Sequence, residues 1–330
     1  MSTVRITLFA FALALTPISG AALRAADIDP LVPPDTQTYL SINVKSILES
    51  SLFEKQLLGP VKDLLGEAPE VKDILGDLGF DPLKDIHRVL FAMPGGPDAD
   101  RGLAIAHGTF DVAKFEKRAK DAAENNDDVL KVHKVKLGAD ATATVWEVVV
   151  PGQDTSIFVA IVSDKIMVAS PGKDYVIDAL KQHRAKKKAT LKNKEFQALV
   201  ESLDAKQTIS IAVLGKSLAA AVADVLPAGI ADSLGKIEAI GGGLTVGDEV
   251  KLDLVVAGQD ATSAESIRST LDKGVKLGMV GLALLTEGRK ELEVLLEVVK
   301  TIKVGGKGKV VSVSAKLTAD MLKDFFGKDE

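Results

Sequence analysis

The chain has no cysteine among its 330 residues. Disulfide bonds, thiolate metal sites and cysteine nucleophiles are therefore excluded, and so is the lipid-modified N-terminus of a bacterial lipoprotein, which requires a cysteine at its cleavage site. A fold without these supports must be held by its hydrophobic core. A chain of this length is long enough to bury one.

Aromatic residues are also scarce. They make up 4% of the chain, with a single tryptophan, Trp146, and two tyrosines, Tyr39 and Tyr175, whereas hydrophobic residues make up 46%. The core is therefore expected to consist of Leu, Val, Ile and Ala. Surfaces that stack sugars or nucleobases need exposed aromatic side chains, so a carbohydrate cleft and a single-stranded nucleic-acid surface are both disfavoured.

The chain carries no excess of positive charge. Its 41 basic and 46 acidic residues give a net charge of −5, which argues against nucleic acid as a partner. One dense basic run stands out, made of Lys181, Arg184, Lys186, Lys187, Lys188, Lys192 and Lys194. We interpret its centre, residues 186–194, as a solvated basic hinge; contact with an acidic surface, such as anionic lipid or a cell-wall polymer, is the alternative.

Long hydrophobic runs are missing as well. The apolar stretch Ile6–Leu15 follows Arg5 and precedes small residues at 19–26, the pattern of a cleaved secretory signal peptide over residues 1–25. It is shorter than the roughly 20 residues that cross a bilayer, and no later run is long and uncharged enough to do so. We expect a periplasmic or secreted protein; an uncleaved N-terminal anchor is the alternative.

Period-2 and period-3.6 patterns predict an α+β fold. Strands are expected at 39–44, 86–93, 103–110, 130–137, 144–150, 156–162, 165–169, 208–214, in a hairpin over 237–258, and at 301–304 and 310–317. Helices are expected over 47–65 and 69–78, from Asp111, from Pro171, over 195–203, from Lys216, across 261–300 and near the C-terminus. Pro and Gly residues separate these elements.

Two stretches read as copies of one another. Ile86 corresponds to Ile237, Asp111 to Asp260, and the strand from Leu103 to the strand from Val250. The copies predict two similar halves, residues 26–185 and 195–330, each a mostly antiparallel sheet with helices on one face, in split βαβ or ferredoxin-like order.

The second copy indicates which side chains are buried. Val250, Leu252, Leu254 and Val256 alternate with the polar Lys251 and Asp253, so the strand has one wet face. Transferred through the repeat, this pattern assigns the inward positions of the first copy to Leu103, Ile105 and His107.

Few residues suggest chemistry. Gly215-Lys216-Ser217 follows a strand as a phosphate-binding loop would, but Ser210 stands where that motif needs its first glycine, so a helix start is favoured. Asp98 and Asp100 lack the other ligands of a calcium loop and fit a polar hairpin tip. Motifs for serine or zinc hydrolases are absent from the sequence.

The histidines offer one metal hypothesis. A symmetric hairpin would place His87 and His107 on the same face of neighbouring strands, near enough to share a metal. Their repeat counterparts, Glu238 and Val256, instead favour a rim position and a core position, and His133 and His183 are expected in solvent. We therefore assign no catalytic, cofactor-binding or metal-binding residue and expect no cofactor.

Several segments are similar to a group of exported planctomycete proteins that contain a domain of unknown function. The similarity lies in Leu31-Val32-Pro33-Pro34-Asp35-Thr36, in residues 79–86, in Val168-Ala169-Ser170-Pro171 and in residues 241–246. The resemblance implies export and a duplicated α+β build, but it brings no activity and no site residues.

The sequence therefore predicts an exported, soluble, non-enzymatic protein that binds a partner or an apolar ligand. A leucine-rich stretch punctuated by glycine supports the apolar ligand, and it contains Leu282, Leu284, Leu285, Leu292, Leu295 and Leu296. Two alternatives remain at this point: a hydrolase with an unfamiliar histidine and carboxylate site, and a cell-envelope scaffold that assembles through exposed edge strands.

Overall fold

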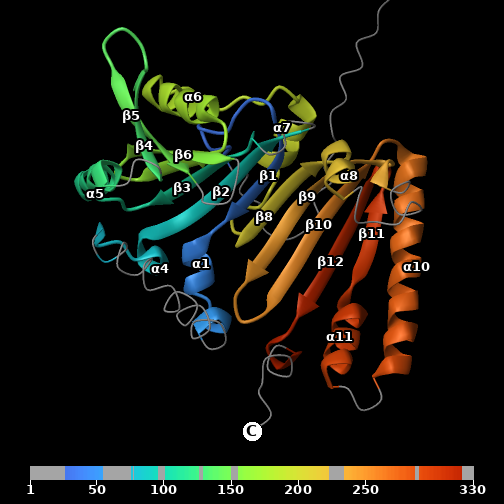
Figure 1. The fold of residues 1–330 in the computed structure, drawn as a ribbon. Helices are drawn as coiled ribbons and strands as arrows, with labels where there is room; N and C mark the ends of the chain where they lie inside the picture. Colours follow the sequence, from blue (N-terminus) through green and yellow to red (C-terminus); the bar gives the residue numbers. More distant parts are fainter. Residues whose placement is uncertain are drawn as a thin grey trace, which may run out of the picture.

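A single antiparallel sheet of 12 strands, in the order β11-β12-β10-β9-β8-β1-β2-β3-β7-β6-β5-β4, forms the centre of the computed structural model (Figure 1). The structure describes residues 27–54, 76, 78–95, 101–125, 129–149, 155–222, 234–286 and 290–321. The expected signal peptide, the hairpin tip with Asp98 and Asp100, the helices expected over 55–75 and most of the expected C-terminal helix lie outside these residues.

The described elements agree closely with those expected from the sequence. The strands are β1 (Thr36–Ile42), β2 (Ile86–Pro94), β3 (Leu103–Gly108), β4 (Leu130–Lys136), β5 (Thr142–Val149), β6 (Ser156–Ser163), β7 (Ile166–Ser170), β8 (Ile209–Leu214), β9 (Ile237–Val246), β10 (Val250–Gly258), β11 (Lys303–Lys307) and β12 (Val310–Leu317). The helices are α1 (Val44–Leu48), α4 (Pro82–Asp85), α5 (Val112–Asn125), α6 (Lys173–Arg184), α7 (Lys194–Glu201), α8 (Gly215–Val222), α10 (Ala261–Leu285) and α11 (Lys290–Thr301).

Side-chain caps fix where several helices begin. The Asn193 side chain accepts a hydrogen bond from the Phe196 N–H at the start of α7, and the Asp260 side chain does the same for Ser263 at the start of α10. Such caps satisfy backbone donors that have no partner inside the helix. Among the described helices, α10 is the longest, at 25 residues.

The two parts of the sheet meet where β1 pairs with β8. Tyr39 lies opposite Ala212 and Ser41 opposite Ser210 in an antiparallel register. From this pair, β2 and β3 follow on one side and β9 and β10 on the other. The expected split βαβ or ferredoxin-like order is therefore wrong: such an order needs a parallel crossover, whereas β2 returns directly beside β1 and antiparallel to it.

Both faces of the sheet carry helices, which corrects the expectation of one covered face. We name the two faces by their side chains: the core face carries Leu103, Tyr39 and Ala212, and the aliphatic face carries Phe91, Leu40 and Ile211. On the core face, Leu199 of α7 lies against Gly241 of β9. On the aliphatic face, Ile267 of α10 packs in one cluster with Val256 and Val311.

The register also corrects the proposed match between the inward positions of β3 and β10. Leu103 and Ile105 are fully buried, as expected. However, pairing across the sheet connects Leu103 through Tyr39, Ala212 and Gly241 to Val255, not to a residue of the Leu252–Leu254 row. Since successive strand residues point to opposite faces, the inward side chains of the two strands lie on opposite faces.

The basic segment 186–194 is attached to the core at one point. Leu191 is completely buried within the main hydrophobic cluster, and the Lys192 N–H donates a 2.6 Å hydrogen bond to the Pro34 carbonyl oxygen. Lys186, Lys187 and Lys188 are exposed just before it.

We predict that Leu191→Ala lowers the free energy of unfolding by about 2–4 kcal/mol, because it removes buried methyl groups and leaves a cavity. Urea unfolding followed by circular dichroism measures the change, with Lys188→Ala as the control in the same segment. Equal midpoints for Leu191→Ala and the wild type would show that this segment does not help to hold the core.

Candidate functional site

The aliphatic face carries rows of apolar side chains that run across the middle of the sheet. One row follows the cross-strand pairs from Phe91 through Leu40, Ile211 and Gly242 to Leu254. The adjacent row follows Val89, Ile42, Ile209, Leu244 and Leu252. These two rows contain no charged or hydrogen-bonding side chain.

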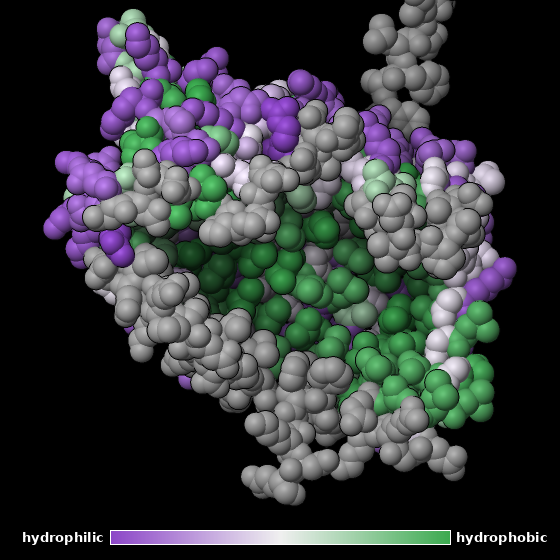
Figure 2. Space-filling view, in the orientation of Figure 1, coloured by the Kyte–Doolittle hydropathy of each residue, from purple (hydrophilic) through white to green (hydrophobic). Residues whose placement is uncertain are grey.

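These side chains line a concave surface, which Figure 2 shows as a depression with hydrophobic atoms at its floor. We call it the apolar hollow and define it by Leu40, Ile42, Val89, Phe91, Ile209, Ile211, Leu244, Leu252 and Leu254. Each of these residues is only half-buried. Monomeric soluble proteins rarely leave a contiguous apolar patch of this kind uncovered unless it binds something.

The core face is closed at the corresponding positions. Tyr39 and Ala212 are buried there, and Leu199 fills the space beside Gly241 so tightly that a Cβ on that glycine would meet its Cδ1 at 2.6 Å. The same strands are thus covered by packed side chains on the core face, whereas the apolar hollow lies on their aliphatic face. Gly242 has no side chain, so the row on the aliphatic face has a gap at this position. Its φ of +140° favours glycine.

A polar cluster lies on the core face at the ends of β2 and β3. His107 Nε2 is 2.5 Å from Asp29 Oδ2, and the Leu31 N–H donates to Asp29 Oδ1 at 2.9 Å. Arg88 donates to Ser41 Oγ at 2.8 Å and to Tyr39 Oη at 2.9 Å. The Asp29–His107 contact connects the segment before β1 to the sheet, and the Arg88 contacts join β2 to β1.

The electrostatics of Asp29 fit this structural role. Burial raises the pKa of the carboxyl, but the hydrogen bonds from His107 and Leu31 and the positive charge of Arg88 outweigh burial and hold the pKa below its usual value. Asp29 therefore remains ionised in the folded protein and holds the segment in place.

The histidine pair considered for a metal does not exist. Arg88, not His87, lies opposite His107, because a register shift occurs between Ile86 and Arg88. His87 itself has no partner residue in β3 and is exposed. His133 was expected in solvent but is half-buried, and its Nε2 lies 2.6 Å from Glu147 Oε2. No group of three or more metal-ligating side chains occurs in the described part of the chain.

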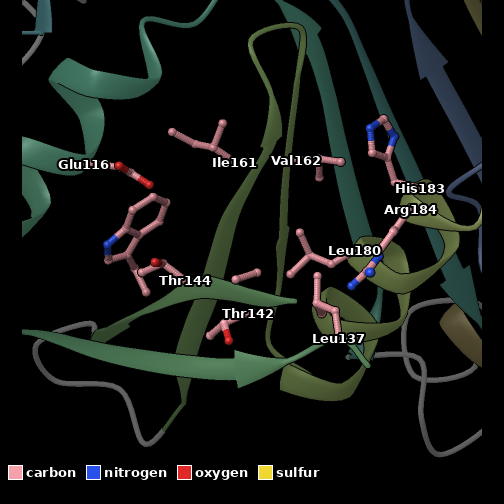
Figure 3. A pocket seen from close by; sticks show the side chains of 11 residues that line it. Glu116, Leu137, Thr142, Thr144, Ile161, Val162, Leu180, His183 and Arg184 are labelled. Atoms are coloured by element: carbon pink, nitrogen blue, oxygen red, sulfur yellow. The ribbon is translucent and has the colours of Figure 1, made fainter. Parts of the chain in front are cut away.

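A cavity of about 310 Å³ opens where β5 separates from β6. Figure 3 shows His183 and Arg184 of α6 on one side and Glu116 of α5 on the other, with Thr142 and Thr144 between them. His183 is exposed, as expected from the sequence. The mixed, open lining provides neither a nucleophile and base pair nor a continuous apolar wall.

Gly215 has a packing role, which confirms the helix start expected at Gly215-Lys216-Ser217. A Cβ at Gly215 would come within 1.8 Å of the Ile237 carbonyl oxygen, so only glycine fits between β8 and β9. The helix α8 begins at this residue, and the Ser217 hydroxyl donates to Gln37 Oε1.

Comparisons with known proteins give a likeness in structure but none in sequence. No protein-family model matches the chain, and no curated protein matches it in sequence. Three crystal forms of TP0453, a Treponema protein, are similar in structure. Form III has a TM-score of 0.49 and 13% identity, over 89% of this chain and 96% of that one.

The other two forms give similar values. Form I has a TM-score of 0.46 and 12% identity, over 91% of this chain and 97% of that one. Form IV has a TM-score of 0.48 and 11% identity, over 92% and 97%. Values this low carry no function from TP0453 to this protein.

We predict that Asp29→Asn lowers the free energy of unfolding by about 1–3 kcal/mol at neutral pH, because it removes a buried charge-assisted hydrogen bond. In the wild type, the stabilisation by ionised Asp29 is fully present above the pKa of the unfolded state, about 3.9. It is lost as the pH falls through the lower pKa that Asp29 has in the folded state. Urea unfolding at pH 7 and below pH 4 measures the difference between variant and wild type. A difference that does not shrink in acid would contradict the role given to the ionised carboxylate.

Proposed function

We propose that the protein is a non-enzymatic carrier or receptor that holds the acyl chain of a lipid-like molecule in the apolar hollow. The observation that carries the proposal is the half-exposed aliphatic floor formed by β2, β1, β8, β9 and β10. Transfer of such a surface from water to contact with a hydrocarbon chain is favourable by about 25 cal/mol for each Å² removed from water.

The chemistry of the hollow selects among apolar ligands. Phe91 is the one aromatic residue among the nine that define it, so flat aromatic ligands or sugars would find few stacking partners. Aliphatic side chains pack equally well against any stretch of methylene groups. A flexible hydrocarbon chain fits this lining best, and its affinity is expected to rise about threefold to fourfold for each added CH₂.

The proposal includes export and a duplicated build. The N-terminal pattern over residues 1–25 supports export to the periplasm or outside the cell. The runs β1-β2-β3 and β8-β9-β10 extend in opposite directions from the β1–β8 pair, and each is followed by a helix, α5 or α10, which supports descent from one repeated unit. The similarity to exported planctomycete proteins agrees with both.

A hydrolase has weaker support. His107 is the histidine with a buried carboxylate partner, but its partner Asp29 serves to bind the N-terminal segment, and no serine hydroxyl is seen to contact His107 among the described residues. A serine triad needs such a hydroxyl within hydrogen-bond reach of its histidine.

A scaffold assembled through sheet edges is disfavoured by the edge strands themselves. β4 carries Lys131, Lys134 and Lys136, and β11 carries Lys303 and Lys307. Lysines along an edge strand oppose pairing with another strand, because pairing would bring like charges together and remove them from water.

We predict that the chain binds a fluorescent fatty-acid probe and that the double substitution Ile211→Asn and Leu254→Asn weakens binding at least tenfold. The two polar amides would lie on the floor of the hollow, where a bound acyl chain leaves them without hydrogen-bond partners. Fluorescence titration gives the Kd, and unlabelled acids of increasing length should compete with increasing strength.

Val255→Asn is the matched control, since Val255 lies next to Leu254 in β10 but points to the core face, where it is 40% exposed. It should leave the Kd unchanged. Equal loss of binding in both variants, or no dependence on chain length, would show that the probe does not occupy the hollow.

A further inference from the structure

The second half of α10 exposes a stripe of aliphatic side chains. Leu277 is 73% exposed, Val280 60%, Leu284 78% and Leu285 58%. Positions 277, 280 and 284 follow one face of a helix. Leucine and valine so exposed, in one contiguous stripe, are unusual on a soluble surface.

The same face of α10 is positively charged. Lys273 and Lys276 are exposed beside the stripe, and neither forms an ion pair in the described part of the chain. Asp272 is the last acidic residue of the helix, so residues 273–285 contain lysine but no carboxylate. This patch differs in sign from the chain as a whole, whose net charge is −5.

From this surface we infer that α10 docks on an anionic lipid bilayer, with Leu277, Val280 and Leu284 in contact with the acyl region and Lys273 and Lys276 at the headgroups. A helix with one aliphatic face and adjacent lysines is the form that lies in a membrane interface. The lysines supply the charge complementarity to acidic headgroups.

The composition of the patch favours a bilayer over a protein as its partner. Protein interfaces concentrate their binding energy in Trp, Tyr and Arg. The stripe has none of these and consists of leucine and valine. A symmetric dimer through this surface is also disfavoured, because residues 273–285 contain no acidic residue that could pair with Lys273 or Lys276. In such a dimer each lysine would face the same lysine of the other copy or an aliphatic side chain.

The position of α10 agrees with surface docking. No helix among the described residues is both long and apolar enough to cross a membrane. In Figure 2 the hydrophobic surface continues from the hollow to the area that α10 and α11 occupy in Figure 1. Leu295 of α11 is also 41% exposed. The inference does not depend on ligand binding in the hollow, because the stripe is exposed to solvent in its own right.

The absence of cysteine allows a local test in the full-length chain. Ala283→Cys, exposed next to the stripe, is labelled with a polarity-sensitive fluorophore and titrated with vesicles of phosphatidylcholine alone or with about a third phosphatidylglycerol. We expect a blue shift with the anionic vesicles. The same label at Val132→Cys, exposed in β4 at the far edge of the sheet, should not shift.

Two further variants test the two parts of the surface. Leu277→Asn with Leu284→Asn should raise the lipid concentration at half-saturation about tenfold or more, and the high exposure of both leucines leaves folding intact. Lys273→Gln with Lys276→Gln should remove most of the preference for anionic vesicles, about fivefold for each lysine.

Other results would overturn the inference. One is the absence of any shift with anionic vesicles; another is a shift that the leucine substitutions do not change. A shift without lipid that grows with protein concentration, together with a dimer in ultracentrifugation that Leu284→Asn dissociates, would assign the stripe to a second copy of the chain. Loss of fatty-acid binding by the hollow variants would leave the vesicle result unchanged, so the two proposals can fail separately.

Discussion

The pairing of β1 with β8 is the constraint on which the rest of the structure depends. It joins the strands of the first part of the chain to those of the second in one sheet, with Tyr39 opposite Ala212 and Leu40 opposite Ile211. Because side chains alternate along a strand, this register decides which residues of β10 share a face with those of β3. A shift by one residue would place Leu40 beside Ala212 and would interrupt both the core face and the aliphatic face.

The hollow follows from this register and from unequal covering of the two faces. On the core face the N-terminal segment, α6, α7 and Leu191 close over the central strands. On the aliphatic face α10 packs over Val256 and Val311 toward one side of the sheet. The rows through Leu40 and Ile211 remain half-exposed between the elements that cover the sides. A single sheet therefore has a packed core on one face and the apolar hollow on the other.

Local pattern was sufficient for most of the secondary structure. The alternation of Leu252, Asp253 and Leu254 identified β10, and Asp111 and Asp260 marked the starts of α5 and α10 within one residue. The site was harder to predict. β1 and β8 lie far apart in the sequence, and no residue in either strand marks them as partners. The leucine-rich stretch suggested an apolar ligand, but it did not show that the floor of the hollow is formed by the central strands.

The two errors come from strand pairing. The match of Leu103 to Leu252 assumed that both copies present the same face, whereas the register through β1 and β8 aligns Leu103 with Val255. The match of His87 to the face of His107 assumed a regular hairpin, whereas the register shifts between Ile86 and Arg88. Irregularities of this kind are not visible in a hydrophobic pattern, and each changes the face on which the following side chains lie.

Native mass spectrometry of the chain, purified without detergent, tests the central claim most directly. The account predicts a population with added mass that corresponds to one acyl-chain lipid, and loss of that mass in the Ile211→Asn, Leu254→Asn variant but not in Val255→Asn. Bare protein in every preparation, with no uptake of added fatty acid, would contradict it.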